Sequence, residues 1–155
     1  MGFIIQNLQA GDLRHFKELI DVFEQVFEMP PFQRASDSYL QELLTGDSFY
    51  VFVAMHEGKV VAGLTAYQLK NYYEEISYLY IFDLGVLGSF QRKGIGRALI
   101  SAVREFSSSR GFEEVFVQAD RADDYALDFY RATGGNEEDV VHFTYNTNPV
   151  KRKNS

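Results

Sequence analysis

Cysteine and tryptophan are both absent from this chain of 155 residues. Without cysteine there can be no disulfide, no thiolate metal ligand and no cysteine nucleophile, and the redox compartment stays undetermined. No segment approaches about 18 uninterrupted apolar residues, and the start of the chain lacks the charged residues and long apolar run of a secretion signal. We therefore expect a cytoplasmic protein that does not span a membrane.

Positive charge is also scarce, because 15 lysine and arginine residues stand against 22 aspartate and glutamate residues, for a formal net charge of −7. Nucleic acid is disfavoured as a partner, since it requires lysine and arginine clustered toward the phosphates. The acidity either keeps the protein soluble or attracts a cationic small molecule, and both interpretations stay open. No set of side chains requires a metal ion.

The chain is rich in hydrophobic residues, at 46%, and its length suits one globular domain with a single core. A strand is predicted over residues 3–8, and the apolar spacing predicts a helix over 12–27. A shorter helix, capped by Ser36 with Asp37, is predicted to end at Gly46. The connection between the two helices is predicted to lie on the substrate side.

The middle of the chain predicts three strands. Residues 48–56 and 59–69 are rich in β-branched and aromatic side chains and flank a tight turn, so they predict an antiparallel hairpin. A third strand is predicted over 76–86, followed by a glycine-containing loop and a helix over 94–110. Strand, glycine loop and helix thus follow one another directly.

The last third of the chain predicts two strands around one helix. The first strand covers residues 113–119, and the helix opens at Asp123 or Asp124 and ends at Gly134-Gly135. The second strand covers residues 140–145 and closes the sheet.

This order of elements predicts an α/β (α+β) fold, a mixed sheet with helices on both faces. No internal repeat or linker divides the chain. We expect one domain over residues 1–148 and a frayed C-terminal tail over 149–155.

The loop after the third strand has the features of a phosphate site. Gly94 and Gly96 let backbone N–H groups approach phosphate oxygens where a Cβ would obstruct them, and the next helix adds the positive end of its dipole. Arg92, Lys93 and Arg97 supply mobile positive charge at the same point. Such glycines can also serve turn geometry alone, and the loop is neither a Rossmann fingerprint nor a P-loop.

A strand that ends in Val86 and leads to Gln91-Arg92-Lys93-Gly94-Ile95-Gly96 resembles the signature of the GNAT N-acetyltransferase superfamily. The resemblance extends to Ala126, Phe129, Tyr130 and Gly134, which have the superfamily's spacing in the second half. The chain departs from that pattern where Asp123 replaces an asparagine and Gly135 replaces an aromatic residue.

The resemblance implies the GNAT acyl-CoA N-acyltransferase fold, with a mostly antiparallel sheet, and acetyl transfer from acetyl-CoA to a primary amine. It also implies that the sheet splays beside Leu84-Gly85-Val86, where backbone donors hold the acetyl carbonyl and the pantetheine amide. Gly85 fits that expectation, because a glycine inside a strand commonly marks a bulge or a close backbone approach. The implied coenzyme A site comprises Leu84, Gly85, Val86, Gln91, Arg92, Lys93, Gly94, Ile95, Gly96 and Arg97.

Within the superfamily the chain is most similar to the aminoglycoside 3-N-acetyltransferases, the gentamicin acetyltransferases. The likeness covers roughly residues 78–143 and implies 3-N-acetylation of an aminoglycoside, with antibiotic resistance as its consequence. The stretches that carry it are Tyr80-Ile81-Phe82-Asp83-Leu84, Val117-Gln118-Ala119-Asp120, Asp123-Asp124, Glu137-Glu138 and Val141-His142-Phe143.

Direct transfer requires a neutral amine, a donor for the developing oxyanion and an acid for the leaving thiolate. Tyr130 is the predicted acid, since the resemblance places it near the sulfur and a phenol can protonate a thiolate; a packing role is the alternative. Asp83, in an otherwise apolar strand, and Asp120, at the end of the next strand, are the candidate bases. A carboxylate buried in a strand is costly without a partner, which favours Asp83, although a structural hydrogen bond would also explain it.

Several acids could match the ammonium groups of a polycation. Each also has a structural interpretation, as a helix cap, a solvated face or, for the histidine, a satisfied half-buried side chain. The predicted acceptor contacts are Asp120, Asp123, Asp124, Glu137, Glu138 and His142.

Two rival functions remain open. A polyamine, an amino sugar or a peptide amine would also suit an acidic pocket, and a non-catalytic acyl-CoA-binding module could keep the fold without the chemistry. A homodimer is plausible as well, because the aromatic segment 140–145 could pair or pack across a second copy.

Overall fold

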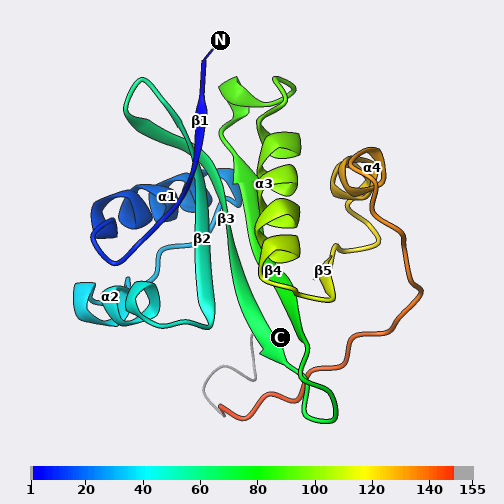
Figure 1. Ribbon diagram of the computed structural model, residues 1–155. Helices are drawn as coiled ribbons and strands as arrows, with labels where there is room; N and C mark the ends of the chain where they lie inside the picture. Colours follow the sequence, from blue (N-terminus) through cyan, green and yellow to red (C-terminus); the bar gives the residue numbers. More distant parts are fainter. Residues whose placement is uncertain (1, 149–155) are drawn as a thin grey trace. The chain divides into compact units, whose positions relative to one another are not determined.

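The computed structural model describes residues 2–148 of the chain. The chain divides into two compact units, Met1–Ala119 and Asp120–Ser155. The first unit contains a five-stranded sheet with helices on both faces, as Figure 1 shows. The second unit contains one helix and a long segment without secondary structure in its described part.

The sheet of the first unit has the strand order β1-β2-β3-β4-β5. Neighbouring strands are antiparallel, except that β4 and β5 run parallel and are joined by a helical crossover. The strands are β1 (Ile4–Asn7), β2 (Phe49–His56), β3 (Lys59–Lys70), β4 (Ser77–Val86) and β5 (Glu114–Val117). The five strands predicted before residue 120 are thus confirmed, with ends that differ by at most two residues.

Three α-helices cover the two faces of this sheet: α1 (Leu13–Val26), α2 (Asp37–Thr45) and α3 (Ile95–Ser109). Helices α1 and α2 lie on one face and α3 lies on the other (Figure 1). All three were predicted. The hydroxyl of Ser36 caps α2 by accepting a hydrogen bond of 3.2 Å from the backbone N–H of Tyr39, and Asp37 lies in the first turn, as predicted. None of the described helices is long and apolar enough to cross a bilayer.

Each face of the sheet has its own core. Leu19 of α1 packs with Val51 and Val53 on one face, while Leu99 of α3 packs with Leu79 on the other, and all five side chains are fully buried. Burying such a side chain contributes roughly 1.5–3 kcal/mol, so these two layers supply much of the driving force that holds the helices on the sheet.

A pair of glycines brings α1 close to the sheet. Gly63 of β3 lies opposite Gly85 of β4. A Cβ on Gly63 would lie 2.6 Å from Cδ1 of Leu19, and a Cβ on Gly85 would lie 3.2 Å from Cδ1 of Phe23. The atoms that approach Gly85 are side-chain atoms of Phe23 and Phe27, so the expected close backbone approach at Gly85 is not what these contacts show.

The second unit begins with α4 (Asp124–Ala132), which confirms the predicted helix. The carboxylate of Asp123 caps it by accepting a hydrogen bond of 3.1 Å from the N–H of Ala126. The chain leaves the helix through Gly134, whose φ of 95° lies in the left-handed region that favours glycine.

The predicted closing strand over residues 140–145 is wrong. Its alternating apolar side chains suggested a half-buried strand, but a strand also needs a hydrogen-bonded neighbour, and these residues have none among residues 2–148. Val141, Phe143 and Tyr145 are 75%, 76% and 89% exposed. The predicted tail over 149–155 lies outside the described residues.

Candidate active site

A β-bulge in β4 determines which way Asp83 points. Ile81 pairs with Ala66 of β3, whereas Asp83 pairs with Thr65, so Phe82 is an extra residue. In a regular strand Ile81 and Asp83 would share one face. Instead Ile81 packs in the core on the α3 side, and Asp83 lies on the α1 side.

Asp83 lines a cavity of about 460 Å³ on the α1 side of the sheet. Most of the lining is apolar, and it comes from α1 and from the segment that joins α1 to α2. The lining residues are Ile20, Phe23, Phe27, Met29, Phe32, Arg34, Ala35 and Asp83. The predicted substrate-side connection therefore does form a wall of a cavity.

The apolar surroundings change the acid strength of Asp83. Partial burial of its carboxyl group raises the pKa above the ordinary value for aspartate, because desolvation disfavours the charged form. Burial also raises the pKa of Tyr67 on β3, helped by Tyr39 and by Asp83 itself. A carboxylate with a raised pKa in an apolar cavity is suited to accept a proton near neutral pH.

Strand β4 continues beyond its parallel neighbour. Strand β5 pairs with β4 only from Tyr78 to Ile81, and the remainder of β4 has no partner on that side among the described residues. The N–H of Leu87 donates to the carbonyl of Val61, so in the alternating ladder the N–H groups of Leu84 and Val86 point away from β3, toward the open side. Among the described residues β4 thus has an unpaired edge beside Leu84 and Val86, while Gly85 faces Gly63. The splay that the resemblance implies stays a prediction.

The loop after β4 turns back onto the strand. The side-chain amide of Gln91 donates a hydrogen bond of 3.1 Å to the carbonyl of Val86. Arg92 and Gly94 both have a left-handed backbone, with φ of 60° and 84°. Helix α3 then begins, and the N–H groups of Ile95 and Gly96 precede its first intrahelical bond, from Ala98 to Gly94.

This loop can hold an anion. Arg92, Lys93 and Arg97 are exposed beside the start of α3, and the ammonium group of Lys93 lies 6.0 Å from the ring centroid of Phe90. Backbone donors, helix dipole and basic side chains thus meet at one place, as a diphosphate requires. The residues present therefore fit the phosphate end of coenzyme A, and the open side of β4 fits its amide-containing arm.

The other predicted catalytic residues belong to the second unit. Tyr130 lies on α4, where its half-buried ring is 5.1 Å from that of Phe129. Asp120 is exposed and accepts a hydrogen bond from the N–H of Ala122, which stabilises the turn before α4. Asp123 serves as the cap and Asp124 lies in the first turn of the helix, so a structural role explains Asp123 but does not require Asp124.

The acidic segment after α4 is partly neutralised within its own unit. The carboxylate of Glu137 binds Arg131, a hydrogen bond that lowers the pKa of Glu137 below its ordinary value. Asp139 pairs with Arg121 at 2.9 Å. Glu138 and His142 are exposed. Among residues 2–148, no three His, Asp or Glu side chains gather in a way that could hold a metal ion.

The apolar and cationic lining of the cavity was not predicted. The sequence pattern places Phe23 and Phe27 on the apolar face of a helix and does not distinguish Phe32 or Arg34 from their neighbours. To predict this lining one would need to know which apolar side chains are exposed. Phe27 and Phe32 are 41% and 46% exposed, which a sequence pattern does not reveal. Apolar residues within a predicted loop were the available signal.

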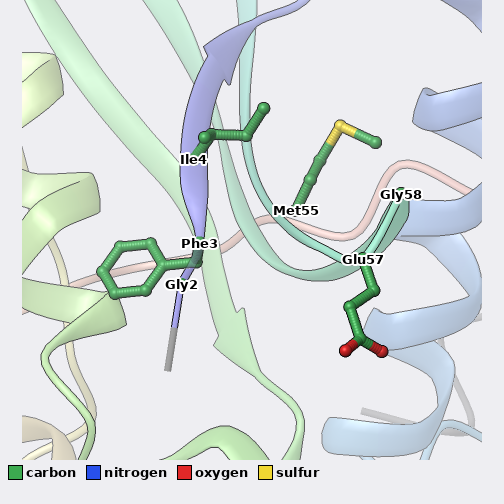
Figure 2. A pocket seen from close by; sticks show the side chains of 6 residues that line it. All are labelled: Gly2, Phe3, Ile4, Met55, Glu57 and Gly58. Carbon is green, nitrogen blue, oxygen red and sulfur yellow. The ribbon is translucent and has the colours of Figure 1, made fainter.

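A second concave region lies between the start of β1 and the β2–β3 turn (Figure 2). Its volume is about 280 Å³, and Figure 2 shows the Glu57 carboxylate turned away from Met55. No predicted site residue lines it. The residues are Gly2, Phe3, Ile4, Met55, Glu57 and Gly58. Since no polar groups converge there, the cavity beside Asp83 is the better candidate for chemistry.

An unpaired strand edge next to a loop that can hold an anion suits a protein that uses acyl-coenzyme A as acyl donor. The model of the acetyltransferase (GNAT) family matches residues 15–134, and the chain belongs to this family. Acetyl-CoA is the acetyl donor of GNAT acetyltransferases. The expected family and fold are thereby confirmed.

Two solved structures are similar over nearly the whole chain. The aminoglycoside acetyltransferase meta-AAC0020 from an uncultured soil metagenomic sample, in complex with sisomicin, has 51% identity and a TM-score of 0.92, over 94% of this chain and 97% of that one. The aminoglycoside acetyltransferase HMB0005, also from an uncultured soil metagenomic sample, has 33% identity and a TM-score of 0.90, over 96% of this chain and 100% of that one.

A curated relative is more distant. N-acetyltransferase family 8 member 3 of Mus musculus is 26% identical over 102 residues, which are 66% of this chain and 45% of the relative. The chain thus matches less than half the length of this relative.

Proposed function

We propose that this acetyltransferase transfers the acetyl group of acetyl-CoA to a primary amine of an aminoglycoside, at nitrogen 3, by direct transfer. The observation that carries the choice of substrate class is the 51% identity with an aminoglycoside acetyltransferase over 94% of the chain. The formal net charge of −7 is in keeping with a polycationic acceptor. Nitrogen 3 rests on the resemblance of the segment 78–143 to the 3-N-acetyltransferases.

Residues of β4 and the following loop would hold the donor. In the proposal, the loop Gln91–Gly96 and the start of α3 bind the phosphates through backbone N–H groups and basic side chains. The N–H groups of Leu84 and Val86 bind the carbonyl oxygen of the acetyl group and the arm behind it. Acetyl-CoA itself supplies an activated thioester carbonyl.

Two side chains would move the protons. The carboxylate of Asp83 accepts a proton from the acceptor nitrogen as the C–N bond forms, which its apolar cavity favours by raising the pKa. The hydroxyl of Tyr130 gives its proton to the sulfur as the C–S bond breaks. Asp120 is the alternative base, and Asp123, Asp124, Glu137, Glu138 and His142 remain proposed acceptor contacts.

The test is a thiol-release assay with acetyl-CoA and a panel of amines that includes sisomicin, gentamicin, spermidine, glucosamine and a short peptide. Acetylation of the aminoglycosides, with the N-acetyl position assigned by two-dimensional NMR of the product, is the expected result. Turnover of another amine alone would keep the family and remove the aminoglycoside. Binding of acetyl-CoA without turnover of any amine would favour a non-catalytic module.

We also propose a homodimer that covers the segment 140–145. The support is the exposure of its apolar side chains, 64% at Val140 and 76% at Phe143, which is unusual for a surface that faces only water. Sedimentation equilibrium should give twice the chain mass for the wild type and a lower mass for Phe143→Asp. A wild-type monomer at micromolar concentration would remove the proposal.

The proposed cellular setting is the cytoplasm, where acetyl-CoA is available, and the proposed consequence is resistance. Acetylation converts an ammonium group into a neutral amide and removes a charge on which an aminoglycoside depends. Expression in a susceptible bacterium should raise the inhibitory concentration of the acetylated compounds only.

We further propose that the two units act as one domain. The family model runs from residue 15 to residue 134 and so includes α4, beyond the division at Ala119. Residues 1–119 produced alone should therefore fail to transfer acetyl groups even if they bind acetyl-CoA.

A further inference from the structure

The wall of the Asp83 cavity that joins α1 to α2 has few attachments of its own. Residues 30–35 make no backbone–backbone hydrogen bond with any other described residue. Two of these residues are Pro30 and Pro31, which have no N–H to donate. Met29 and Phe32 of this segment are 44% and 46% exposed, so burial holds them only in part. Something else must fix the wall in place.

Arg34 provides the attachment. Its Nε donates a hydrogen bond of 2.8 Å to Oε1 of Glu24, and its terminal nitrogen binds the carboxylate of Asp21. Asp21 and Glu24 are three residues apart on α1, so they lie on one side of the helix and present two carboxylates to one planar guanidinium. These two hydrogen bonds raise the pKa of Arg34 above its ordinary value, and the bond to Glu24 has the larger effect.

The arrangement is unusual for a cavity that is to bind a cation. A free arginine in the lining would repel the acceptor, whereas Arg34 with two carboxylates forms a group of net charge −1. The guanidinium of Arg34 can therefore hold the two carboxylates in place without repelling a cationic acceptor.

We propose that Arg34 is a positioning residue: by binding Asp21 and Glu24 it holds the α1–α2 connection against α1, and so keeps the cavity around Asp83 shaped for the acceptor and shielded from water. The inference rests on the proposed function in one respect, that Asp83 serves the acceptor amine. The attachment of the wall itself does not depend on that function.

Two effects on Asp83 oppose each other when Arg34 is removed. Loss of a nearby positive charge would raise the pKa of Asp83, while entry of water would lower it. Tyr67 from β3 interacts with Asp83, Tyr39 from α2 interacts in turn with Tyr67, and Arg34 from the connection lines the same cavity. Burial is nevertheless the cause of the raised pKa of Asp83. Hydration is therefore the larger effect, and the acidic limb of the pH–rate profile should move to lower pH.

The test compares Arg34→Ala, Arg34→Lys and Arg14→Ala. Arg14 is a matched control, because it also pairs with an acid on α1, Glu18 at 3.4 Å, but lies away from the cavity. For Arg34→Ala we expect about a ten- to hundred-fold loss of kcat/KM for the amine, an unchanged KM for acetyl-CoA and the shifted acidic limb. Arg34→Lys should recover part of the loss, since lysine keeps the charge but lacks the fork.

Limited proteolysis gives a second readout that needs no substrate. Chymotrypsin cleaves after aromatic residues, and Phe32 lies in the connection. Cleavage after Phe32 should quicken in Arg34→Ala and in the double variant Asp21→Asn/Glu24→Gln, and stay unchanged in Arg14→Ala. If cleavage in Arg34→Ala is no faster than in the wild type, the proposal is wrong. If the wild type acetylates no amine while cleavage quickens as expected, the proposed function fails and the attachment stands.

Discussion

Asp83 stands opposite Thr65 across the β3–β4 ladder, although Ile81, only two residues earlier, stands opposite Ala66. The extra residue between them, Phe82, rotates Asp83 out of the core beneath α3 and into the cavity beside Phe23. One irregular residue thus converts a costly buried carboxylate into a candidate base.

Asp83→Asn should abolish most acetyl transfer and yet stabilise the protein. The folded state raises the pKa of Asp83, so it binds this proton more tightly than the unfolded chain does. As the pH rises through the raised value, ionisation of Asp83 costs stability, whereas below the unfolded pKa of about 3.9 there is no cost. The melting temperature of Asp83→Asn should therefore exceed that of the wild type at pH 8, and the difference should vanish below about pH 4.

A control for that comparison is Asp47→Asn, which makes the same change at an exposed residue. Equal melting temperatures of Asp83→Asn and wild type at pH 8 would show that the carboxyl group is not desolvated.

The bulge also marks how far the sequence predicts this site. The order of the first nine elements, the loop Gln91–Gly96 and the identity of Asp83 all follow from local patterns and from the GNAT resemblance. The face of the sheet on which Asp83 lies cannot be predicted from these patterns. Side chains alternate along a regular strand, which would put Asp83 on the same face as Ile81, and only the pairing with β3 reveals the extra residue.

The predicted strand over residues 140–145 is wrong for a related reason. Alternation of apolar residues reports that a strand could bury one face, but it contains no information about whether a neighbouring strand is there to receive it. Arg34 was missed because its two partners are 10 and 13 residues away in sequence and become neighbours only once α1 is formed.

Gly94→Ala should weaken the binding of acetyl-CoA. Gly94 has a φ of 84°, a conformation that costs a residue with a Cβ about 1–2 kcal/mol and that sets the direction of the first N–H groups of α3. We expect a several-fold rise in the KM for acetyl-CoA with little change in the KM for the amine. Gly88→Ala is the control, since a Cβ at Gly88 meets nothing within 4 Å.

Tyr130→Phe tests the proposed acid. The ring and its packing against Phe129 are kept, while the hydroxyl is lost. General acid catalysis typically contributes about 10²–10⁴-fold, so kcat at saturating substrates should fall by such a factor. Unchanged turnover at saturating substrates would remove Tyr130 from the mechanism.

Gly63→Ala should destabilise the first unit. Its Cβ would lie 2.6 Å from Cδ1 of Leu19 and 2.7 Å from the carbonyl oxygen of Phe52, so either α1 or the strands must move. Overpacking of this kind costs typically 1–3 kcal/mol, measurable by urea denaturation. Gly11→Ala has open space around its Cβ and should be near neutral, and equal midpoints for the two variants would contradict the close approach.

The side-chain attachment of the α1–α2 connection through Arg34 has a consequence for engineering this chain. Ten residues of wall can change length and composition without disturbing a single strand hydrogen bond, provided that one guanidinium and two carboxylates persist. The sheet is held by dense packing on both faces, whereas this segment lines the cavity beside Asp83 and is therefore a natural place to introduce diversity when a new acceptor is sought.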